Sequence, residues 1–330
     1  MRMFEDFSKL EVRTETIPEK SDLEKVLDVE KEIIKQYEND KRFEPYKGKH
    51  FEAYESLCQS TQEKLTDVTL IPEILQSYID ARDNTEENIQ TIIRGMYSSA
   101  VLEIILARQP DSYTFIDGRE KTFNHLFYCI HHVKNLTLQN IAGNNILYNA
   151  GRNNRNIKNI ILQNITGNNI LYNAGSDKGS VANIILDNVV GYNTLRNAGN
   201  WHGIVSNITL NNVKGDNILY QVSWKGNAKN ITLNNVKGHN ILYDAGRNGS
   251  VANITLKQTT GNNILWNAGS DKGSVANILR EYQLTEKQKN ILLQIETIAK
   301  TIHTLSFEQQ EKAHDEIAEL KEEIFLEKKK

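Results

Sequence analysis

Hydrophobic and polar residues alternate in short runs through the middle of the chain, and a longer period is superimposed on them. Counting from Asn135, a frame of the form Asn-Ile-x-Leu restarts after 24, 24, 24, 23, 23 and 24 residues. No helical periodicity runs through the repeat, which disfavours leucine-rich and helical repeat folds. Short apolar alternations separated by Gly and Asn predict two or three short strands in each turn of a parallel β-solenoid.

Equivalent residues of successive coils stack about 4.8 Å apart in such a fold, so each repeat position becomes a column. Three columns are predicted to point inward and form a narrow core: Leu138, Leu162, Leu186, Leu210, Leu233 and Leu256; Leu147, Leu171, Leu195, Leu219, Leu242 and Leu265; and Val181, Val205, Val251 and Val275. A further column is predicted at bends, where side-chain amides bond to the backbone and to one another. It consists of Asn145, Asn169, Asn193, Asn217, Asn240 and Asn263.

The flanking segments have helical patterns. Ser21 and Glu24 form a capping box before apolar residues at helical spacing, and Pro72 suits a first helical turn. A long apolar helix from about Ile89 should end before Pro110. We therefore expect an N-terminal α-helical domain at 1–110, a degenerate capping coil at 111–134, solenoid repeats at 135–279 and an amphipathic helical hairpin at 280–330. Both helical parts are expected to cap the open ends of the solenoid.

The coil length and the stacked Asn, Ile and Leu positions resemble the right-handed parallel β-helix superfamily, which includes pectate lyases and phage tailspikes. The resemblance covers about residues 135–279 and points to no specific family. It implies a mainly β fold: a single-stranded parallel β-solenoid of about six 24-residue coils between the two helical parts. Members of that superfamily include lyases, hydrolases, adhesins and non-catalytic scaffolds, so the fold alone does not select a function.

Charge and cysteine content narrow the functional classes. The 330 residues carry a formal net charge of −3, which argues against a protein that mainly coats nucleic acid or a membrane, so nucleic acid is an unlikely partner. That sum divides into −8 for 1–134, +7 for 135–279 and −2 for 280–330, which leaves open a local positive face toward an anionic polymer. Cys58 and Cys129 make no disulfide framework. Without a signal-peptide pattern or an 18-residue apolar run, a cytoplasmic location is expected, and signal-independent secretion stays open.

The repeats contain few residues that could carry out catalysis. The six coils contain only five acids, Asp177, Asp187, Asp216, Asp244 and Asp271, and these occupy four different columns. Carbohydrate cleavage needs clustered carboxylates, so no catalytic residue is predicted. Gly175–Ser180 lacks the ending of a phosphate-binding loop and is interpreted as a turn. His131 and His132 are adjacent on a predicted strand and should point to opposite faces, so neither a metal nor a cofactor is expected.

Strand alternation around the inward Leu147 column predicts two outward columns that flank it. One is mainly aliphatic: Ile146, Ile170, Thr194, Ile218, Ile241 and Ile264. The other is mainly aromatic: Tyr148, Tyr172, Arg196, Tyr220, Tyr243 and Trp266. Arg196 supports the outward assignment, because an unpaired Arg in a narrow apolar core would be very costly. An exposed apolar stripe of this size is typical of an interface.

Three explanations of the stripe stay open at this point. The 285–327 hairpin could cover it, a protein partner or a second copy could bind it, or sugars could stack on the aromatic column. The preferred hypothesis is a non-enzymatic scaffold or binding protein that uses the stripe for protein contact or self-association. The alternatives are a polysaccharide-binding or polysaccharide-cleaving β-helix protein and a secreted effector or adhesin-like protein.

Overall fold

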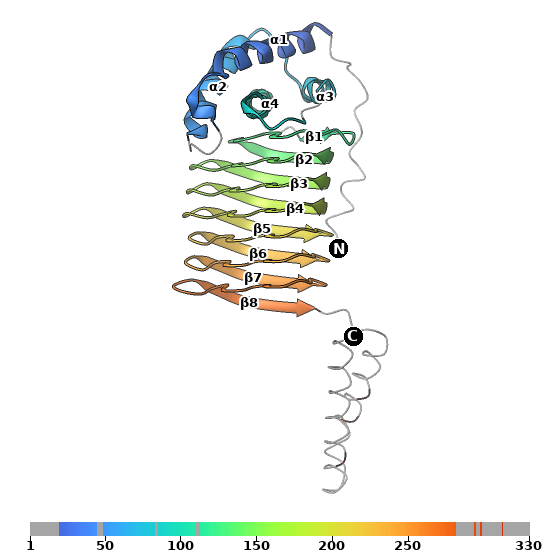
Figure 1. Cartoon of the computed structure of the whole chain (residues 1–330), viewed down its shortest axis with the longest axis vertical. Coiled ribbons are helices and arrows are strands. Elements are labelled where there is room, and N and C mark those ends of the chain that lie inside the picture. The colour runs from blue at the N-terminus through green and yellow to red at the C-terminus, as the bar shows by residue number, and fades with distance from the viewer. Residues whose placement is uncertain are drawn as a thin grey trace. The chain divides into compact units, whose positions relative to one another are not determined.

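Eight parallel strands stack in sequence order into one sheet in a computed structural model (Figure 1). The structure describes residues 20–44, 49–82, 85–109 and 113–281, with 294, 298 and 312 as isolated positions. The strands are β1 (Thr114–Asp117), β2 (Val133–Ala142), β3 (Asn156–Thr166), β4 (Ser180–Val190), β5 (Ile204–Asn211), β6 (Asn227–Asn234), β7 (Ser250–Lys257) and β8 (Ser274–Glu281). The chain is a parallel β-solenoid of about seven turns, so the predicted fold class is confirmed.

The register of the sheet follows the sequence repeat. Asn135 pairs with Asn159, and Asn159 pairs with Asn183, one repeat further along the chain. The columns predicted to form the core are buried: Leu138, Leu162, Leu186, Leu210 and Leu233 have no exposed surface, and Leu256 is 5% exposed. Val181, Val205 and Val251 are also fully buried. Apolar side chains of successive coils therefore form one continuous core along the stack.

Each coil contributes one strand to the sheet, so the prediction of two or three short strands per turn is wrong. The rest of the coil is a succession of overlapping turns. In the coil after β2, Asn145, Leu147 and Asn149 have φ angles of 60°, 54° and 62°. Their carbonyls accept i→i+3 hydrogen bonds at 3.2 to 3.3 Å. A positive φ at every second residue prevents an extended strand, and Asn and Gly are frequent here because they tolerate that conformation.

These turns are bonded to both neighbouring coils. The backbone N–H of Asn149 donates to Tyr172 in the following coil, whereas that of Leu147 donates to Leu126 in the preceding coil. The same alternation recurs at Asn173 and Leu171, one repeat later. Parallel stacking thus satisfies backbone groups outside the strands as well as within them.

Four α-helices precede the first coil: α1 (Lys20–Tyr37), α2 (His50–Lys64), α3 (Pro72–Asp80) and α4 (Ile89–Arg108), with a 3-10 turn, η2, at Lys41–Phe43. The predicted helices after Ser21, at Pro72 and up to Pro110 are present. Sequence reasoning missed α2, whose buried residues include His50 and Thr61 and so obscure its apolar face. Helix α4 is long and apolar enough to cross a membrane, but it is mostly buried among the other helices and the first coil.

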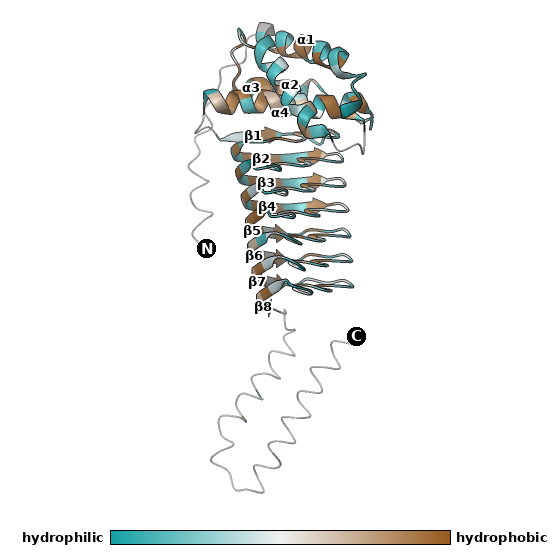
Figure 2. Ribbon diagram, turned by 90° about the vertical axis from the view of Figure 1, so that its left-hand side faces the viewer, coloured by the Kyte–Doolittle hydropathy of each residue, from teal (hydrophilic) through white to brown (hydrophobic). Residues whose placement is uncertain are grey.

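The helices cover the β1 end of the stack, and their polar side chains bond to the backbone of the first coil (Figures 1 and 2). Gln76 of α3 donates to the carbonyl of Asp117 at 2.8 Å and accepts from its N–H at 2.9 Å. Ser99 of α4 donates to the carbonyl of Tyr128 at 3.0 Å. Side chains here replace the partners that a further coil would have supplied.

The chain divides into two units, Met1–Arg280 and Glu281–Lys330. The predicted hairpin at 280–330 lies almost wholly outside the described residues, and its proposed capping role stays a prediction.

Candidate binding surface

The predicted aromatic column is a ladder of stacked rings on the surface of the solenoid. Tyr148 and Tyr172 stack with their centroids 5.0 Å apart and their planes inclined by 7°, and Tyr220 and Tyr243 stack at 5.0 Å and 6°. Tyr128, which is buried in the first coil, extends the stack by packing on Tyr148 at 5.1 Å. The side chains of Tyr148, Tyr172, Arg196, Tyr220 and Tyr243 are partly exposed, and that of Trp266 is 54% exposed. We call these six residues the tyrosine ladder.

Arg196 fills the one position in the middle of the tyrosine ladder that lacks a ring. Its guanidinium carbon lies 5.8 Å from the centroid of Tyr172 and 4.7 Å from that of Tyr220. The side chain is partly exposed rather than in the core, as its charge requires. The cation thus bridges two pairs of tyrosines through their ring faces.

The aliphatic column does not point outward, and that expectation is wrong. Ile146, Ile170, Thr194, Ile218 and Ile241 are fully buried, and Ile264 is partly buried in the last described coil. The prediction assumed strand alternation, in which neighbours of the inward leucine must face solvent. Because Leu147 has a left-handed φ of 54°, the chain turns there, and Ile146 and Leu147 both enter the core. Of the two columns predicted to form an exposed apolar stripe, only the tyrosine ladder therefore lies at the surface.

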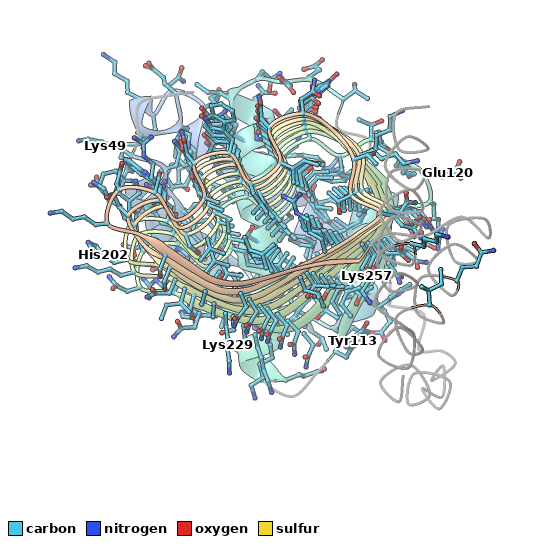
Figure 3. All side chains as sticks on the ribbon, turned by 90° about the horizontal axis from the view of Figure 1, so that it is seen from below. Lys49, Tyr113, Glu120, His202, Lys229 and Lys257 are labelled. Atoms are coloured by element: carbon cyan, nitrogen blue, oxygen red, sulfur yellow. The ribbon has the colours of Figure 1, made fainter. Side chains whose placement is uncertain are left out.

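Amides run parallel to the rings. Asn169 donates its side-chain N–H to the Oδ1 of Asn145 at 2.9 Å, and the same bond links Asn193, Asn217, Asn240 and Asn263 at 2.9 to 3.0 Å. The structure thus confirms that the amides in this column bond to one another. Seen along the solenoid axis, side chains of successive coils superpose into such columns (Figure 3). These hydrogen bonds between amides align each coil with the next one and so keep the rings of the tyrosine ladder stacked.

The other sequence candidates are kept apart by the fold. His131 is buried against Tyr54, whereas His132 is exposed, so the pair does point in different directions. Within the described ranges, no three His, Cys, Asp or Glu side chains come together in a way that would hold a metal ion. Gly175–Ser180 forms a turn that leads into β4, in agreement with its interpretation as a turn. Asp177 pairs with Arg152, and Asp271 pairs with Arg247 at 2.7 Å.

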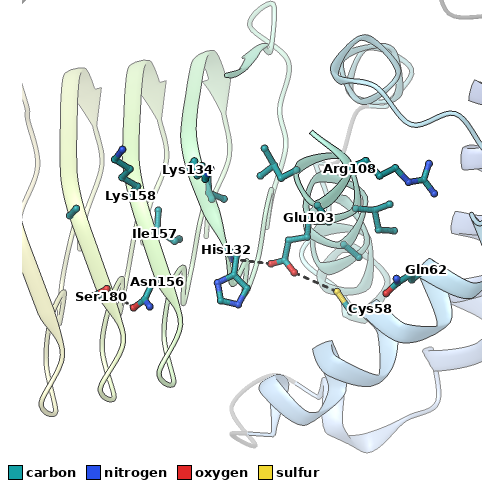
Figure 4. A pocket seen from close by; sticks show the side chains of 16 residues that line it. Cys58, Gln62, Glu103, Arg108, His132, Lys134, Asn156, Ile157, Lys158 and Ser180 are labelled. Atoms are coloured by element: carbon teal, nitrogen blue, oxygen red, sulfur yellow. Dashed lines mark hydrogen bonds between the residues drawn. The ribbon is translucent and has the colours of Figure 1, made fainter. Parts of the chain in front are cut away.

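A groove of about 710 Å³ lies where α2 and α4 meet the starts of β2, β3 and β4 (Figure 4). Its apolar lining includes Ala100, Ile104 and Ile157, and its cationic lining consists of Arg108, Lys134 and Lys158. Sequence reasoning missed this groove because its walls come from segments that are far apart in the chain. Only the packing of the helices on the sheet brings them together.

Glu103 is the acid in this groove. Its Oε1 accepts hydrogen bonds from the backbone N–H groups of His131 and His132, and its Oε2 accepts one from the Cys58 thiol at 3.8 Å. Burial raises the pKa of Glu103 to about 7 despite these bonds, and burial also raises the pKa of Cys58 to about 12. Cys58 is therefore a protonated thiol and not an activated nucleophile. Glu103 serves mainly as an acceptor for the chain where β2 begins.

A second aromatic group was also missed, although two of the three tryptophans in the chain occur in loops of successive coils. Trp201 and Trp224 meet edge to face, with centroids 5.6 Å apart and planes at 86°. Trp201 is 47% exposed. The recurrence of Trp at this loop, just before β5 and β6, was the available sequence signal.

Comparison with known proteins gives no matching family model, no matching curated protein and no matching solved structure. The geometry of the surface is therefore the basis for any functional proposal.

Proposed function

We propose that the chain is a non-enzymatic scaffold that contacts a protein partner, or a second copy of itself, through the tyrosine ladder. The observation that supports this proposal is the regular arrangement of the tyrosine ladder. Its partly exposed side chains recur once per coil, stack on one another and lie beside the hydrogen-bonded asparagine column. A preordered surface loses little side-chain entropy on binding, and Tyr and Arg are favoured in protein interfaces.

The stacking also indicates which contacts the ladder offers. Both faces of the Tyr148, Tyr172 and Tyr220 rings have neighbours along the stack, so their edges and hydroxyl groups are what a ligand can meet. One face of the Tyr243 ring is occupied, by Tyr220. Sugar stacking requires a free ring face, which disfavours the carbohydrate alternative for Tyr148, Tyr172 and Tyr220. Hydroxyl groups spaced by about 4.8 Å suit hydrogen bonds to a partner that also repeats at the strand spacing.

The test removes the hydroxyl groups and keeps the rings. The triple variant Tyr172→Phe, Tyr220→Phe and Tyr243→Phe preserves stacking, and Tyr192→Phe, at a 56% exposed tyrosine outside the ladder, is the matched control. Sedimentation velocity over a concentration series measures self-association, and a photocrosslinker at Tyr172 identifies contacts with other proteins in cells. We expect association or crosslinking that the triple variant weakens at least tenfold and the control leaves unchanged. A monomer at all concentrations, with no protein crosslinked at Tyr172, would refute the proposal.

A further inference from the structure

Three successive coils bring aromatic and cationic side chains together at the loop that precedes each strand. We call Lys178, Trp201, His202, Trp224 and Lys225 the tryptophan edge. His202 marks its position at one end of the coil cross-section (Figure 3). This surface is separate from the tyrosine ladder, and the proposal below does not depend on the function proposed above.

Backbone hydrogen bonds hold the three loops of the edge in register. The N–H of Lys178 donates to the carbonyl of Trp201 at 3.1 Å, and the N–H of His202 donates to the carbonyl of Lys225 at 2.7 Å. The buried side chain of Asn200 accepts from the backbone N–H groups of Trp201 at 2.7 Å and Lys225 at 3.1 Å. The tryptophans are thus presented by a fixed backbone.

The two indoles share one cation. The Lys225 ammonium lies 4.0 Å from the ring centroid of Trp201 and 4.8 Å from that of Trp224. Trp201 still exposes almost half of its surface, and the buried indole N–H of Trp224 has no acceptor among the described residues. A ligand with a flat aromatic face and negative charge would use both the exposed Trp201 indole and the neighbouring ammonium group.

The surroundings of the edge are positive. Lys178 is exposed in the same group of loops, and Lys229 is exposed on the adjoining outer face of β6 (Figure 3). The acid beside these lysines, Asp177, is paired with Arg152. The near-zero net charge of the whole chain conceals this local excess of positive charge, because the helical part carries the balancing acids.

We propose that the tryptophan edge binds single-stranded nucleic acid. A base would stack on the exposed surface of Trp201, which Trp224 supports edge to face, and phosphates would contact Lys178, Lys225 and Lys229. Single strands combine flat aromatic bases with one negative charge per nucleotide, and proteins bind them by aromatic stacking beside cationic side chains. Neutral sugars would not use the lysines, and a nucleic acid base offers the indole a larger flat face than the ring of a sulfated sugar does.

The experiment measures the binding of the full chain to a fluorescein-labelled oligothymidylate of roughly 15 nucleotides by anisotropy. We expect binding at ~50 mM salt that weakens linearly on a log–log plot as salt rises. Trp201→Ala should weaken binding by about 5- to 150-fold, the range for loss of one base–aromatic stack. Lys178→Ala and Lys225→Ala should each lower the salt slope by about 0.7.

Matched controls occupy other parts of the same solenoid. Trp266→Ala removes an exposed tryptophan from the tyrosine ladder, and Lys214→Ala removes an exposed lysine beyond the end of β5. Both should leave oligonucleotide affinity within about twofold of the unaltered chain. Trp201→Phe keeps an aromatic face and should bind more tightly than Trp201→Ala, which separates loss of stacking from loss of folding.

Three results would overturn the proposal. One is no oligonucleotide binding at low salt, and a second is an equal loss in the control variants. The third is binding of a sulfated polysaccharide such as heparin in the absence of oligonucleotide binding, which would assign the edge to a different class of polymer. The photocrosslinking test of the tyrosine ladder can fail without affecting any of these outcomes.

Discussion

Individual leucines and asparagines in the solenoid adopt a backbone conformation that most residues avoid. Leu147, Leu171, Leu195, Leu219 and Leu242 all have φ between 54° and 57° and are fully buried. A left-handed conformation costs an L-residue roughly 1–2 kcal/mol, whereas full burial of a Leu contributes about 1.5–3 kcal/mol. Burial offsets the strain at the leucines, and the asparagines need no such compensation because they tolerate this region.

Asn193 allows strain and hydrogen bonding to be separated. Its φ is 57°, its side chain donates to Asn169 at 2.9 Å, and it accepts from Asn217 at 3.0 Å. The Oδ1 of Asn193 also accepts from Arg196 at 3.4 Å. Asn193→Gly should lower the free energy of unfolding by about 2–3 kcal/mol through the three lost bonds. Asn193→Ala should lower it by about 1 kcal/mol more, because alanine is strained at this φ.

Urea unfolding of both variants measures this difference, and Asn154→Gly, at an exposed left-handed position, is the control. Equal stabilities of Asn193→Gly and Asn193→Ala would show that the backbone relaxes at this bend.

Glu103 should make stability depend on pH. Its pKa is about 7 in the folded protein because of burial, against an ordinary value of 4.5. The folded state therefore binds this proton more tightly, so the stabilising contribution is complete below pH 4.5 and is lost as pH rises through about 7. Burial acts in the opposite sense on His131, whose pKa it lowers from 6.5 to about 3. The contribution of the neutral His131 to folding stability is therefore complete above pH 6.5 and is lost as pH falls from 6.5 toward 3.

Glu103→Gln can still accept from the N–H groups of His131 and His132 but does not titrate. Urea unfolding at several pH values should show that the variant lacks the loss of stability between pH 4.5 and 7. Glu55→Gln, at an exposed carboxylate, should retain that loss. A Glu103→Gln variant with an unchanged pH profile would assign the dependence to other groups.

At the scale of elements, the junction between the helices and the first coil depends on a few polar side chains. Gln76 makes both backbone hydrogen bonds of Asp117 in β1. Gln76→Ala should leave a donor and an acceptor without protein partners and lower stability by about 2 kcal/mol.

Hydrogen exchange at 114–117 should accelerate in this variant more than exchange in β4 or β5. Gln59→Ala, which removes an exposed contact to Glu63 on α2, should change neither. Uniform acceleration over all strands would mean that the helices and coils unfold as one unit and that the junction has no stability of its own.

The sequence was sufficient for the coil period, the core leucines and the aromatic column, because each repeats at a fixed interval and the stacking constraint applies to every copy. The directions of side chains between the strands were not predictable in the same way. Ile146 was assigned outward by strand alternation, but a left-handed Leu147 breaks that alternation, and Leu is a residue for which such a φ is not expected. The groove around Glu103 depends on tertiary packing and has no local pattern.

At the scale of the whole molecule, the solenoid is a linear array in which each coil contacts only its neighbours. Removal of one complete period, residues 183–206, places Asn207 over Asn159 with every column intact. The shortened chain should fold and lose about 1–4 kcal/mol of stability for its 24 fewer residues.

Circular dichroism and thermal unfolding measure this outcome. Removal of 183–194 alone, which is half a period, should misalign the columns and abolish cooperative unfolding. If the two deletions behave alike, the columns do not determine the stacking.

The hydrogen bonds that alternate between the coil above and the coil below also have a mechanical consequence. Tension applied to the chain ends must break all bonds along one coil before the next coil carries the load. A coil of 24 residues extends to roughly 80 Å when pulled straight. A single molecule stretched in an optical trap should therefore lengthen in equal steps of about that size. The step length in the force–extension curve would then report the repeat period of the sequence.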